Sequence, residues 1–359
     1  MSKLLKFVKR AQNKIGRKVL DVKMFTIVLS RILDRKPDSI KPGKSIWLDI
    51  NDNYERYTYI LTKYFEIEGF QVYIKANPKF ILSLGDPYAK SIVQENHTIF
   101  SFVKPEHAVA VFSDKSSGSK IISNDYFSTI YNKSDNNSYH IPLGMHPNMY
   151  KGLWNATQPI ADRIFSVFFA GDFNEVSYKR LKRQSKFKMA DRIALKYLLK
   201  TLPNAIFPKT YQELNKLEKH QVHIVDRTNF DIPQEALRST ISKYNFFIAC
   251  PGVAMPLSHN IFEAMSVGTT PILHKDYANM FNPALIDLEN ALIYEDETFL
   301  DVIKKAIEIP EEEATNMNRS TLAYYNEHLT PKAIVQKLTD NNIKTYFLNA
   351  ERASVARLQ

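Results

Sequence analysis

The segment SKYNFFIACPGVAMPLSHNIFEAMSVGTTPILH, residues 242–274, carries the clearest fold signal in the chain. An apolar run ends in the turn Pro251-Gly252, and a second apolar run follows Gly268. Between them, HNIFEAMSV has the apolar spacing of a helix. Two short apolar strands joined by a helix are typical of a parallel α/β unit.

The same alternation extends along the rest of the chain. In the N-terminal half we expect a helix that ends at Gly69 and strands at 45–50, 71–76, 80–88, 98–103 and 108–113. In the C-terminal half, further strands are expected at 163–171 and 222–227, and the segment 292–309 is expected to form a strand followed by a helix. The pattern predicts an α/β fold of two Rossmann-like domains that face each other across a cleft. Ligands of such folds bind beyond the carboxyl ends of the strands.

The length of 359 residues favours two domains, because single cores rarely grow beyond about 250–300 residues. We predict a basic arm at 1–44, an N-terminal Rossmann-like domain at 45–160, a C-terminal Rossmann-like domain at 161–320 and a helical tail at 321–359. The lone Cys250 excludes an intrachain disulfide and suits a reducing compartment. The apolar runs of the arm are too short to span a bilayer. We therefore expect a cytoplasmic protein that associates peripherally with the inner face of the cell membrane.

The arm accounts for the net charge of +10. Residues 1–44 contain thirteen Lys and Arg and three acidic residues, so the rest of the chain is formally neutral. One helical face of the arm is apolar, with Leu4, Val8, Ala11, Ile15 and Val19. This pattern predicts an interfacial helix on an anionic membrane surface, and the alternative is an ordinary helix packed on the fold.

The segment 242–274 also predicts a ligand site. Pro251 and Gly252 would lie at the carboxyl end of a strand, with Ser258 as the N-cap of the following helix, whose N–H groups favour an anion such as a diphosphate. His259 and Asn260 add polar groups there. Glu263 would accept ribose hydroxyls; alternatively, it is a buried residue that complements the helix dipole.

These residues resemble the donor-binding segment of GT-B glycosyltransferases, and the exostosin-like branch in particular. The resemblance rests on Pro251, the pair Glu263-Ala264, and the later Gly268 and Pro271, and it extends from residue 163 to about 305. FFAGDFN, with Gly171, is similar to the opening of the nucleotide-sugar domain of that family.

The resemblance implies transfer of a sugar from a nucleotide-sugar donor to a glycan or lipid-linked acceptor in surface polysaccharide or lipopolysaccharide synthesis. Retaining members often have a second glutamate eight positions before the first, where this chain has Met255, and this departure favours an inverting reaction. Arg180 and Arg183 would then neutralise the donor phosphates, and Arg227 would line the nucleotide pocket. Alternatively, these arginines belong to a solvated helix face or a structural ion pair.

An inverting enzyme needs a general base. The candidates are Asp86, Asp52 and His146, with Asp49 beside Asp52. Each has a structural alternative: Asp86 as a turn former, Asp52 as a helix cap and His146 in interdomain packing.

We expect neither a metal site nor a cofactor, with the nucleotide-sugar donor as co-substrate, since the histidines are scattered and no acidic metal motif follows a strand. A nucleic-acid partner is not expected either, because the basic charge belongs to the arm. Two alternative functions stay open at this point. One is a sugar-nucleotide epimerase on the same fold, and the other is a non-enzymatic nucleic-acid- or membrane-binding protein that uses the arm.

Overall fold

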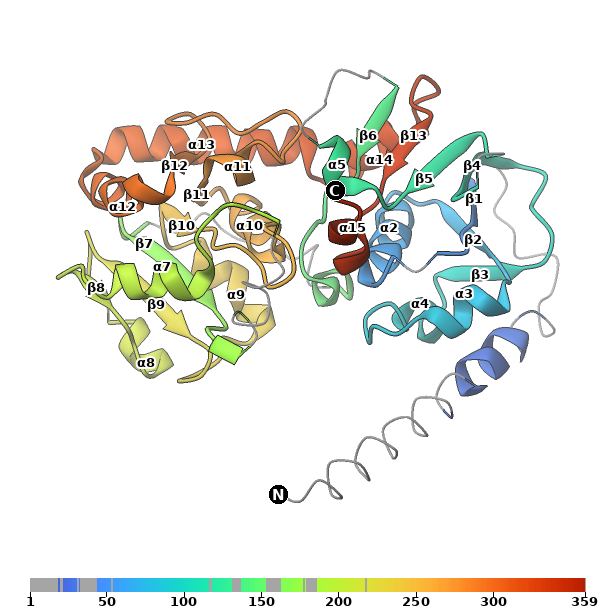
Figure 1. Cartoon of the computed structure of the whole chain (residues 1–359), viewed down its shortest axis with the longest axis horizontal. Coiled ribbons are helices and arrows are strands. Elements are labelled where there is room, and N and C mark those ends of the chain that lie inside the picture. Colours follow the sequence, from blue (N-terminus) through green and yellow to red (C-terminus); the bar gives the residue numbers. More distant parts are fainter. Residues whose placement is uncertain are drawn as a thin grey trace. The chain divides into compact units, whose positions relative to one another are not determined.

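A computed structural model shows two compact α/β units (Figure 1). Unit 1 comprises residues 1–124, 135–139 and 335–350, and unit 2 comprises 125–134, 140–334 and 351–359. The structure describes residues 19, 22–30, 32, 44–52, 54–115, 118–130, 137–152, 163–176, 178, 186–216 and 218–358. Each unit contains one sheet in which the described strand pairs are parallel, so the predicted α/β class is confirmed.

The sheet of unit 1 has the strand order β3-β2-β1-β4-β5-β13-β6. The strands are β1 (Ser45–Asp49), β2 (Gln71–Lys75), β3 (Thr98–Ser101), β4 (Ala108–Ser113), β5 (Lys120–Ser123), β6 (Ser138–His140) and β13 (Thr345–Phe347). Helix α2 (Arg56–Ile67) connects β1 to β2 and ends before Gly69, whose φ of 77° favours glycine. The predicted helix and its stop are therefore confirmed.

The strand predicted at 80–88 is wrong. Residues Pro78–Ser83 form helix α3 instead, with Asn77 as an N-cap whose side chain accepts a hydrogen bond from the Lys79 N–H. Asn followed by Pro at the first helical position is a helix-start signal that outweighs the apolar run. Leu82 is 49% exposed, whereas Phe80 and Ile81 are buried, so only one face of this apolar run is buried. The short helix α4 (Ser91–Gln94) follows before β3.

The C-terminal part of the chain returns to unit 1. Helices α13 (Glu311–His328) and α14 (Pro331–Thr339) confirm the predicted helical period, but the chain then forms β13 beside β5. The buried Lys120 ammonium donates to the Asp340 carbonyl at 2.6 Å and to the Tyr346 hydroxyl at 2.7 Å. This lysine therefore fixes the returning segment through acceptors more than 200 residues away in sequence.

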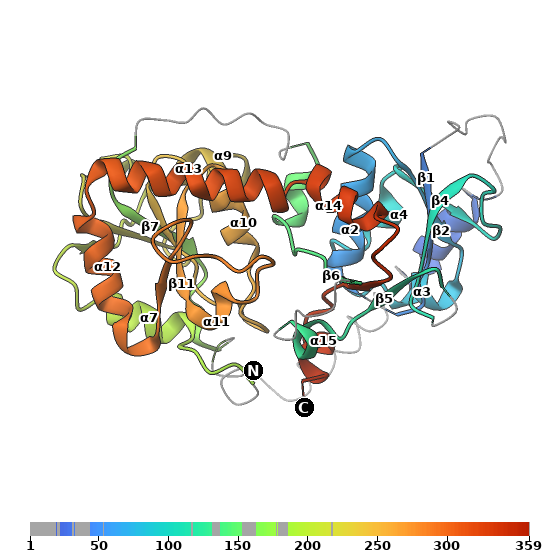
Figure 2. The same ribbon diagram turned by 90° about the horizontal axis from the view of Figure 1, so that it is seen from above.

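The sheet of unit 2 has the order β12-β11-β10-β7-β9-β8. Its strands are β7 (Val167–Gly171), β8 (Ala205–Ile206), β9 (Val222–Asp226), β10 (Phe246–Ile248), β11 (Thr270–His274) and β12 (Leu292–Tyr294). Among its helices, α10 and α13 pack on β11, and α12 packs on β7 and β12 (Figure 2). The helices of unit 2 whose bounds the described residues give are α5 (Tyr126–Thr129), α7 (Arg192–Leu199), α8 (Tyr211–Leu214), α9 (Gln234–Ile241), α10 (His259–Met265), α11 (Lys275–Ala278), α12 (Phe299–Glu308), α13 and α15 (Arg352–Ala356), with 3₁₀ turns η2 (Pro147–Tyr150) and η3 (Asp296–Thr298).

Strand order in unit 2 identifies where a ligand can bind. The connections from β7 lead to β8 and β9 on one side, whereas β10, β11 and β12 follow on the other. The order therefore reverses between β7 and β10, and such a switch point opens a crevice at the carboxyl ends of the strands. Strand β10 belongs to the segment 242–274, borders this switch point and is fully buried.

The basic arm is described only in part. Residues 19, 22–30 and 32 are helical, and the remainder of 1–43 lies outside the described residues. Met24 and Val28 are buried, whereas Val19, the last member of the predicted apolar face, is 64% exposed. Among the described residues, no helix combines the length and the apolar character needed to cross a membrane.

Candidate functional site

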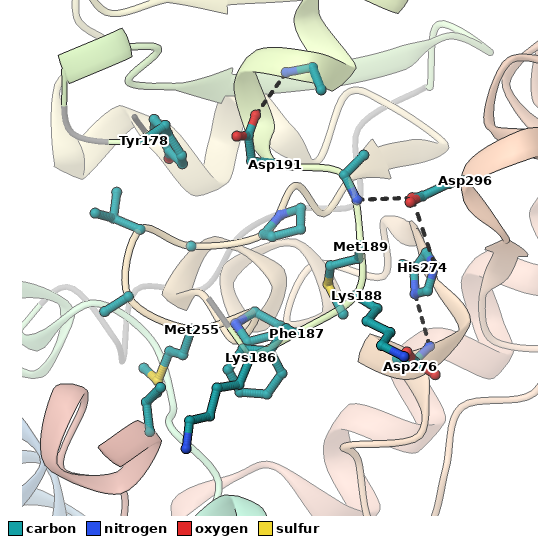
Figure 3. A pocket seen from close by; sticks show the side chains of 18 of the residues that line it. Tyr178, Lys186, Phe187, Lys188, Met189, Asp191, Met255, His274, Asp276 and Asp296 are labelled. Carbon is teal, nitrogen blue, oxygen red and sulfur yellow. Dashed lines mark hydrogen bonds and ion pairs between the residues drawn. The ribbon is translucent and has the colours of Figure 1, made fainter. Parts of the chain in front are cut away.

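A cavity of about 1020 Å³ lies in unit 2 at the carboxyl ends of its strands (Figure 3). Its walls come from the segment that follows β10 (251–256), the residues that follow β11 and β12 (274–276 and 295–297), the segment that leads into α7 (186–191) and helix α15. The cavity therefore occupies the position that the strand order predicts for a ligand.

The loop that follows β10 has a shape that depends on glycine. The Gly252 N–H donates to the Pro256 carbonyl at 3.0 Å, which folds the loop back on itself. A Cβ at Gly252 would lie 2.8 Å from the Met255 carbonyl oxygen and 3.0 Å from that of Leu257. A larger residue at 252 would therefore push this wall out of position.

Two carboxylates lie on one side of the cavity, where Figure 3 shows Asp276 and Asp296 with His274. Asp191 lies elsewhere on the wall and caps α7, because its side chain accepts the Ala194 N–H. The Asp276 N–H donates to Nδ1 of His274 at 3.1 Å, so the neutral ring carries its proton on Nε2, 3.8 Å from the Asp296 carboxylate. Asp296 also accepts the Ala190 N–H at 2.9 Å and so ties η3 to the segment that precedes α7.

Besides Lys275, three cationic side chains line the cavity: Lys186, Lys188 and Arg352. With the residues that the structure describes, none of the three forms an ion pair. Their neighbour Lys275 behaves differently, because it pairs with Glu295 at 2.9 Å. Unpaired cations beside carboxylates on the wall of one cavity complement a ligand that has both anionic groups and hydrogen-bond donors.

A second polar cluster surrounds Glu263. This residue is 2% exposed, and its Oε1 accepts the His146 N–H at 3.0 Å. Burial raises the pKa of Glu263 to about 7, although the His146 hydrogen bond and the Arg238 charge oppose the rise. Nδ1 of His259 lies 3.0 Å from the Gly144 carbonyl oxygen, which only accepts, so this nitrogen carries the ring proton. The rings of His146 and His259 meet edge to face.

The residues predicted to bind the donor divide between these two places. Pro251 and Gly252 line the cavity. The polar residues 258–260 and Glu263 are not among the described residues that line it. Ser258 occupies the predicted N-cap position, but its hydroxyl donates to Asn260 Oδ1 and caps no backbone N–H. The Ser258 N–H donates to the Tyr277 hydroxyl at 2.8 Å.

The predicted phosphate-binding residues are placed as follows. Gly171 ends β7, as predicted, and a Cβ there would lie 2.6 Å from the Phe169 ring. Arg227 is exposed and pairs with Asp231 at 2.9 Å, and it is not among the described residues that line the cavity. Arg180 and Arg183 lie outside the described residues.

The candidate base residues have structural partners in their own units. Asp86 follows α3 rather than a strand, pairs with Arg56 at 2.9 Å and accepts the Tyr88 N–H. Asp52 is exposed, and its N–H donates to Asp114.

Asp49, the neighbour of Asp52, pairs with Lys75 at 2.9 Å. His146 caps η2, because its Nδ1 accepts the Asn148 N–H. Of the structural alternatives, only the turn-forming role of Asp86 is shown, because Asp52 does not cap α2, whose N-cap is Glu55. The catalytic assignments stay predictions.

Sequence reasoning missed most of the cavity wall. The missed residues with charged or titratable side chains are Lys186, Lys188, Asp191, His274, Lys275, Asp276, Glu295, Asp296, Glu297 and Arg352. The sequences LHKD and IYED, at the ends of β11 and β12, held a usable signal, since polar residues directly after buried parallel strands share one sheet edge. Arg352 gave no such signal. Within the described ranges, no group of three or more His, Cys, Asp or Glu side chains could hold a metal ion.

The fold and the cavity define an α/β protein whose second unit has a cavity at a topological switch point. No family model and no curated protein matches the chain. Among solved structures, it is similar to sucrose-phosphate synthase from Thermosynechococcus elongatus, with 10% identity, a TM-score of 0.41 and coverage of 82% of this chain and 97% of that chain. It is also similar to Anabaena Alr3699/HepE in complex with UDP and glucose, with 11% identity, a TM-score of 0.40 and coverage of 82% and 98%. Similarity at this level does not establish a shared activity.

Proposed function

We propose that the protein is a glycosyltransferase that takes its sugar from a nucleotide-sugar donor bound in unit 2. The observation that carries this proposal is the cavity at the carboxyl ends of β10, β11 and β12. Its wall has carboxylates and cations that form no ion pair with the described residues. A nucleotide sugar has the matching chemistry, because its diphosphate attracts cations and its hydroxyls donate to carboxylates. The volume of about 1020 Å³ lies at the upper end of the range for small-molecule sites and suits a ligand of this size.

Within this proposal, the loop at Pro251 and Gly252 shapes the donor site. Its tight fold lets backbone groups approach the ligand closely. Glu263 remains the candidate for the ribose contact that the resemblance to GT-B enzymes implies. Its carboxylate now accepts the His146 N–H, so this contact would require the His146 segment to give up that hydrogen bond.

The finer points of the proposal concern mechanism and acceptor. Sugar transfer would be inverting and independent of a metal or cofactor, with Asp86, Asp52 or His146 as the general base. The acceptor would be a glycan or a lipid-linked glycan in surface polysaccharide or lipopolysaccharide synthesis. The basic arm would hold the protein on an anionic membrane surface where such acceptors reside.

Thermal unfolding in the presence of UDP, GDP, CMP and dTDP sugars tests the donor site. A ligand that binds only the folded protein raises the midpoint, so at least one donor should do so. Ala254→Trp, which places an indole in the cavity, should abolish the rise. Ala353→Trp is the matched control, because Ala353 is exposed on α15 and the cavity lining does not include it.

The absence of a shift with all four donor classes would contradict the proposal. For any donor that binds, products with and without added glycan acceptor separate transfer from epimerisation. A glycosyltransferase forms a glycoside with the acceptor, whereas an epimerase converts the donor without one.

A further inference from the structure

Helix α15, near the C-terminus of the chain, forms part of the cavity wall. Arg352, Val355 and Ala356 of this five-residue helix line the cavity together with the loop at 251–256. These residues follow directly after 335–350, which belong to unit 1. The chain thus places its last helix against a site whose other walls come from residues 178–297.

The position of α15 is fixed by packing rather than by chain connectivity alone. Ser354 is fully buried, and α15 contacts α5 (Figure 1). From α5, the buried Phe127 packs edge to face on Phe187 of the cavity wall, with ring centroids 5.1 Å apart. The side chain of Arg352 is therefore carried by a helix that is tied to the cavity through a continuous set of contacts.

Other arginines of unit 2 are already engaged. Arg163 donates to the carbonyl of Val267 and to the Thr269 hydroxyl, and Arg238 donates to the Ser266 hydroxyl. Arg192 donates to the Asp172 carbonyl and lies over the Phe169 and Tyr178 rings, and Arg227 pairs with Asp231. Arg352, in contrast, lines the cavity and forms no ion pair with the described residues.

We propose that Arg352 binds the anionic group of the ligand, the diphosphate of a nucleotide, and so makes the last helix part of the binding site. This inference rests on the proposed function. A guanidinium suits the role because its planar fork donates two parallel hydrogen bonds to phosphate oxygens. Lys186 and Lys188, from the segment that leads into α7, add positive charge to the same cavity.

The test compares three ligands on three variants. The ligands are the best-bound nucleoside diphosphate, its nucleoside and inorganic pyrophosphate, and calorimetry or fluorescence gives each affinity. The variants are Arg352→Ala, Arg352→Lys and the control Arg357→Ala, which removes an equal charge from an exposed residue directly after α15 that does not line the cavity.

Arg352→Ala should weaken diphosphate binding roughly 10- to 100-fold, the usual cost of a lost charge-assisted hydrogen-bonded pair. It should leave nucleoside binding within about twofold, since the nucleoside has no phosphate for the guanidinium to bind. Arg352→Lys should retain part of the affinity, and Arg357→Ala should resemble the wild type.

Equal losses for the nucleoside and the diphosphate, or no loss at all, would overturn the inference. If the wild type binds no nucleotide but binds pyrophosphate in an Arg352-dependent way, the proposed function fails while the anion site stands. If neither ligand binds, both proposals are wrong.

Discussion

The Glu263 carboxylate accepts the backbone N–H of His146 at 3.0 Å, although 117 residues separate the two in sequence. Glu263 lies in α10, within the segment that decided the fold prediction, and His146 caps η2. The carboxylate is thus already bonded inside unit 2, and burial raises its pKa to about 7. This relationship connects the stability of the unit to pH.

Glu263→Gln should remove a pH dependence from the free energy of unfolding. The pKa of Glu263 is higher in the folded state than its ordinary value of 4.5, so the folded state binds the proton more tightly. The stabilisation that protonated Glu263 contributes is fully present below about pH 4.5 and is lost as the pH rises through about 7. Relative to that of the glutamine variant, the free energy of unfolding of the wild type should therefore fall by roughly 2 to 3 kcal/mol between pH 5 and pH 8.

Urea unfolding of both proteins at pH 5 and pH 8 measures this difference. Glutamine keeps an acceptor for the His146 N–H, so the comparison isolates the charge. Glu313→Gln, at an exposed position of α13, is the control and should show no such change. A constant difference between wild type and Glu263→Gln across the pH range would contradict the buried, proton-binding role.

Gly252→Ala should weaken ligand binding in the cavity. The added Cβ meets the Met255 and Leu257 carbonyl oxygens at 2.8 and 3.0 Å, and backbone atoms cannot move aside without shifting the loop. We expect a loss of about 1 to 3 kcal/mol in stability, as for other overpacked sites, and a clear loss of nucleotide affinity.

Gly85→Ala is the matched control for this substitution, because its nearest contact would be an ordinary 3.8 Å. Calorimetric titration with the nucleotide compares the two variants. Equal affinity of both for the nucleotide would show that the Gly252 loop does not shape the binding site.

Lys120→Met should loosen the C-terminal return to unit 1. Methionine fills much of the same volume but leaves the Asp340 carbonyl and the Tyr346 hydroxyl without the lysine donor. An unpaired buried polar group costs about 1 to 3 kcal/mol, so the free energy of unfolding should fall by at least this amount.

Lys344→Met is the control, since Lys344 is an exposed neighbour of β13. Hydrogen exchange gives the more specific readout. In Lys120→Met, the amides of β13 should exchange faster relative to those of β1. Unchanged protection of β13 would mean that strand pairing alone holds the segment.

Removal of residues 2–18 should reduce binding to anionic vesicles without affecting nucleotide binding. The deletion removes seven Lys and Arg and no acidic residue, and each basic residue near an anionic surface contributes about 1 kcal/mol. Cosedimentation with phosphatidylserine vesicles at low and high salt measures the effect, and phosphatidylcholine vesicles serve as the control. Salt-independent binding that survives the deletion would exclude the arm as the membrane contact.

The sequence alone was sufficient to predict the α/β class and most strands. Short buried strands such as FFI in β10 or VFFAG in β7 are apolar throughout, and glycines such as Gly69 and Gly268 mark where helices end. These signals are local, so a single sequence contains them. The incorrect strand prediction at 80–88 also concerns local signals, because the Asn-Pro helix start before Pro78–Ser83 outweighs the apolar run.

Tertiary structure alone decided how the cavity is built. The bond from Ala190 to Asp296 joins residues 106 positions apart, and Arg352 lies on the same wall as the loop at 251–256, about 100 positions earlier. No period or turn signal encodes such contacts, since they depend on how buried surfaces pack once the strands have formed. The segment 242–274 thus predicts the strand ends at which the cavity lies. The tertiary structure determines which charged side chains surround that cavity.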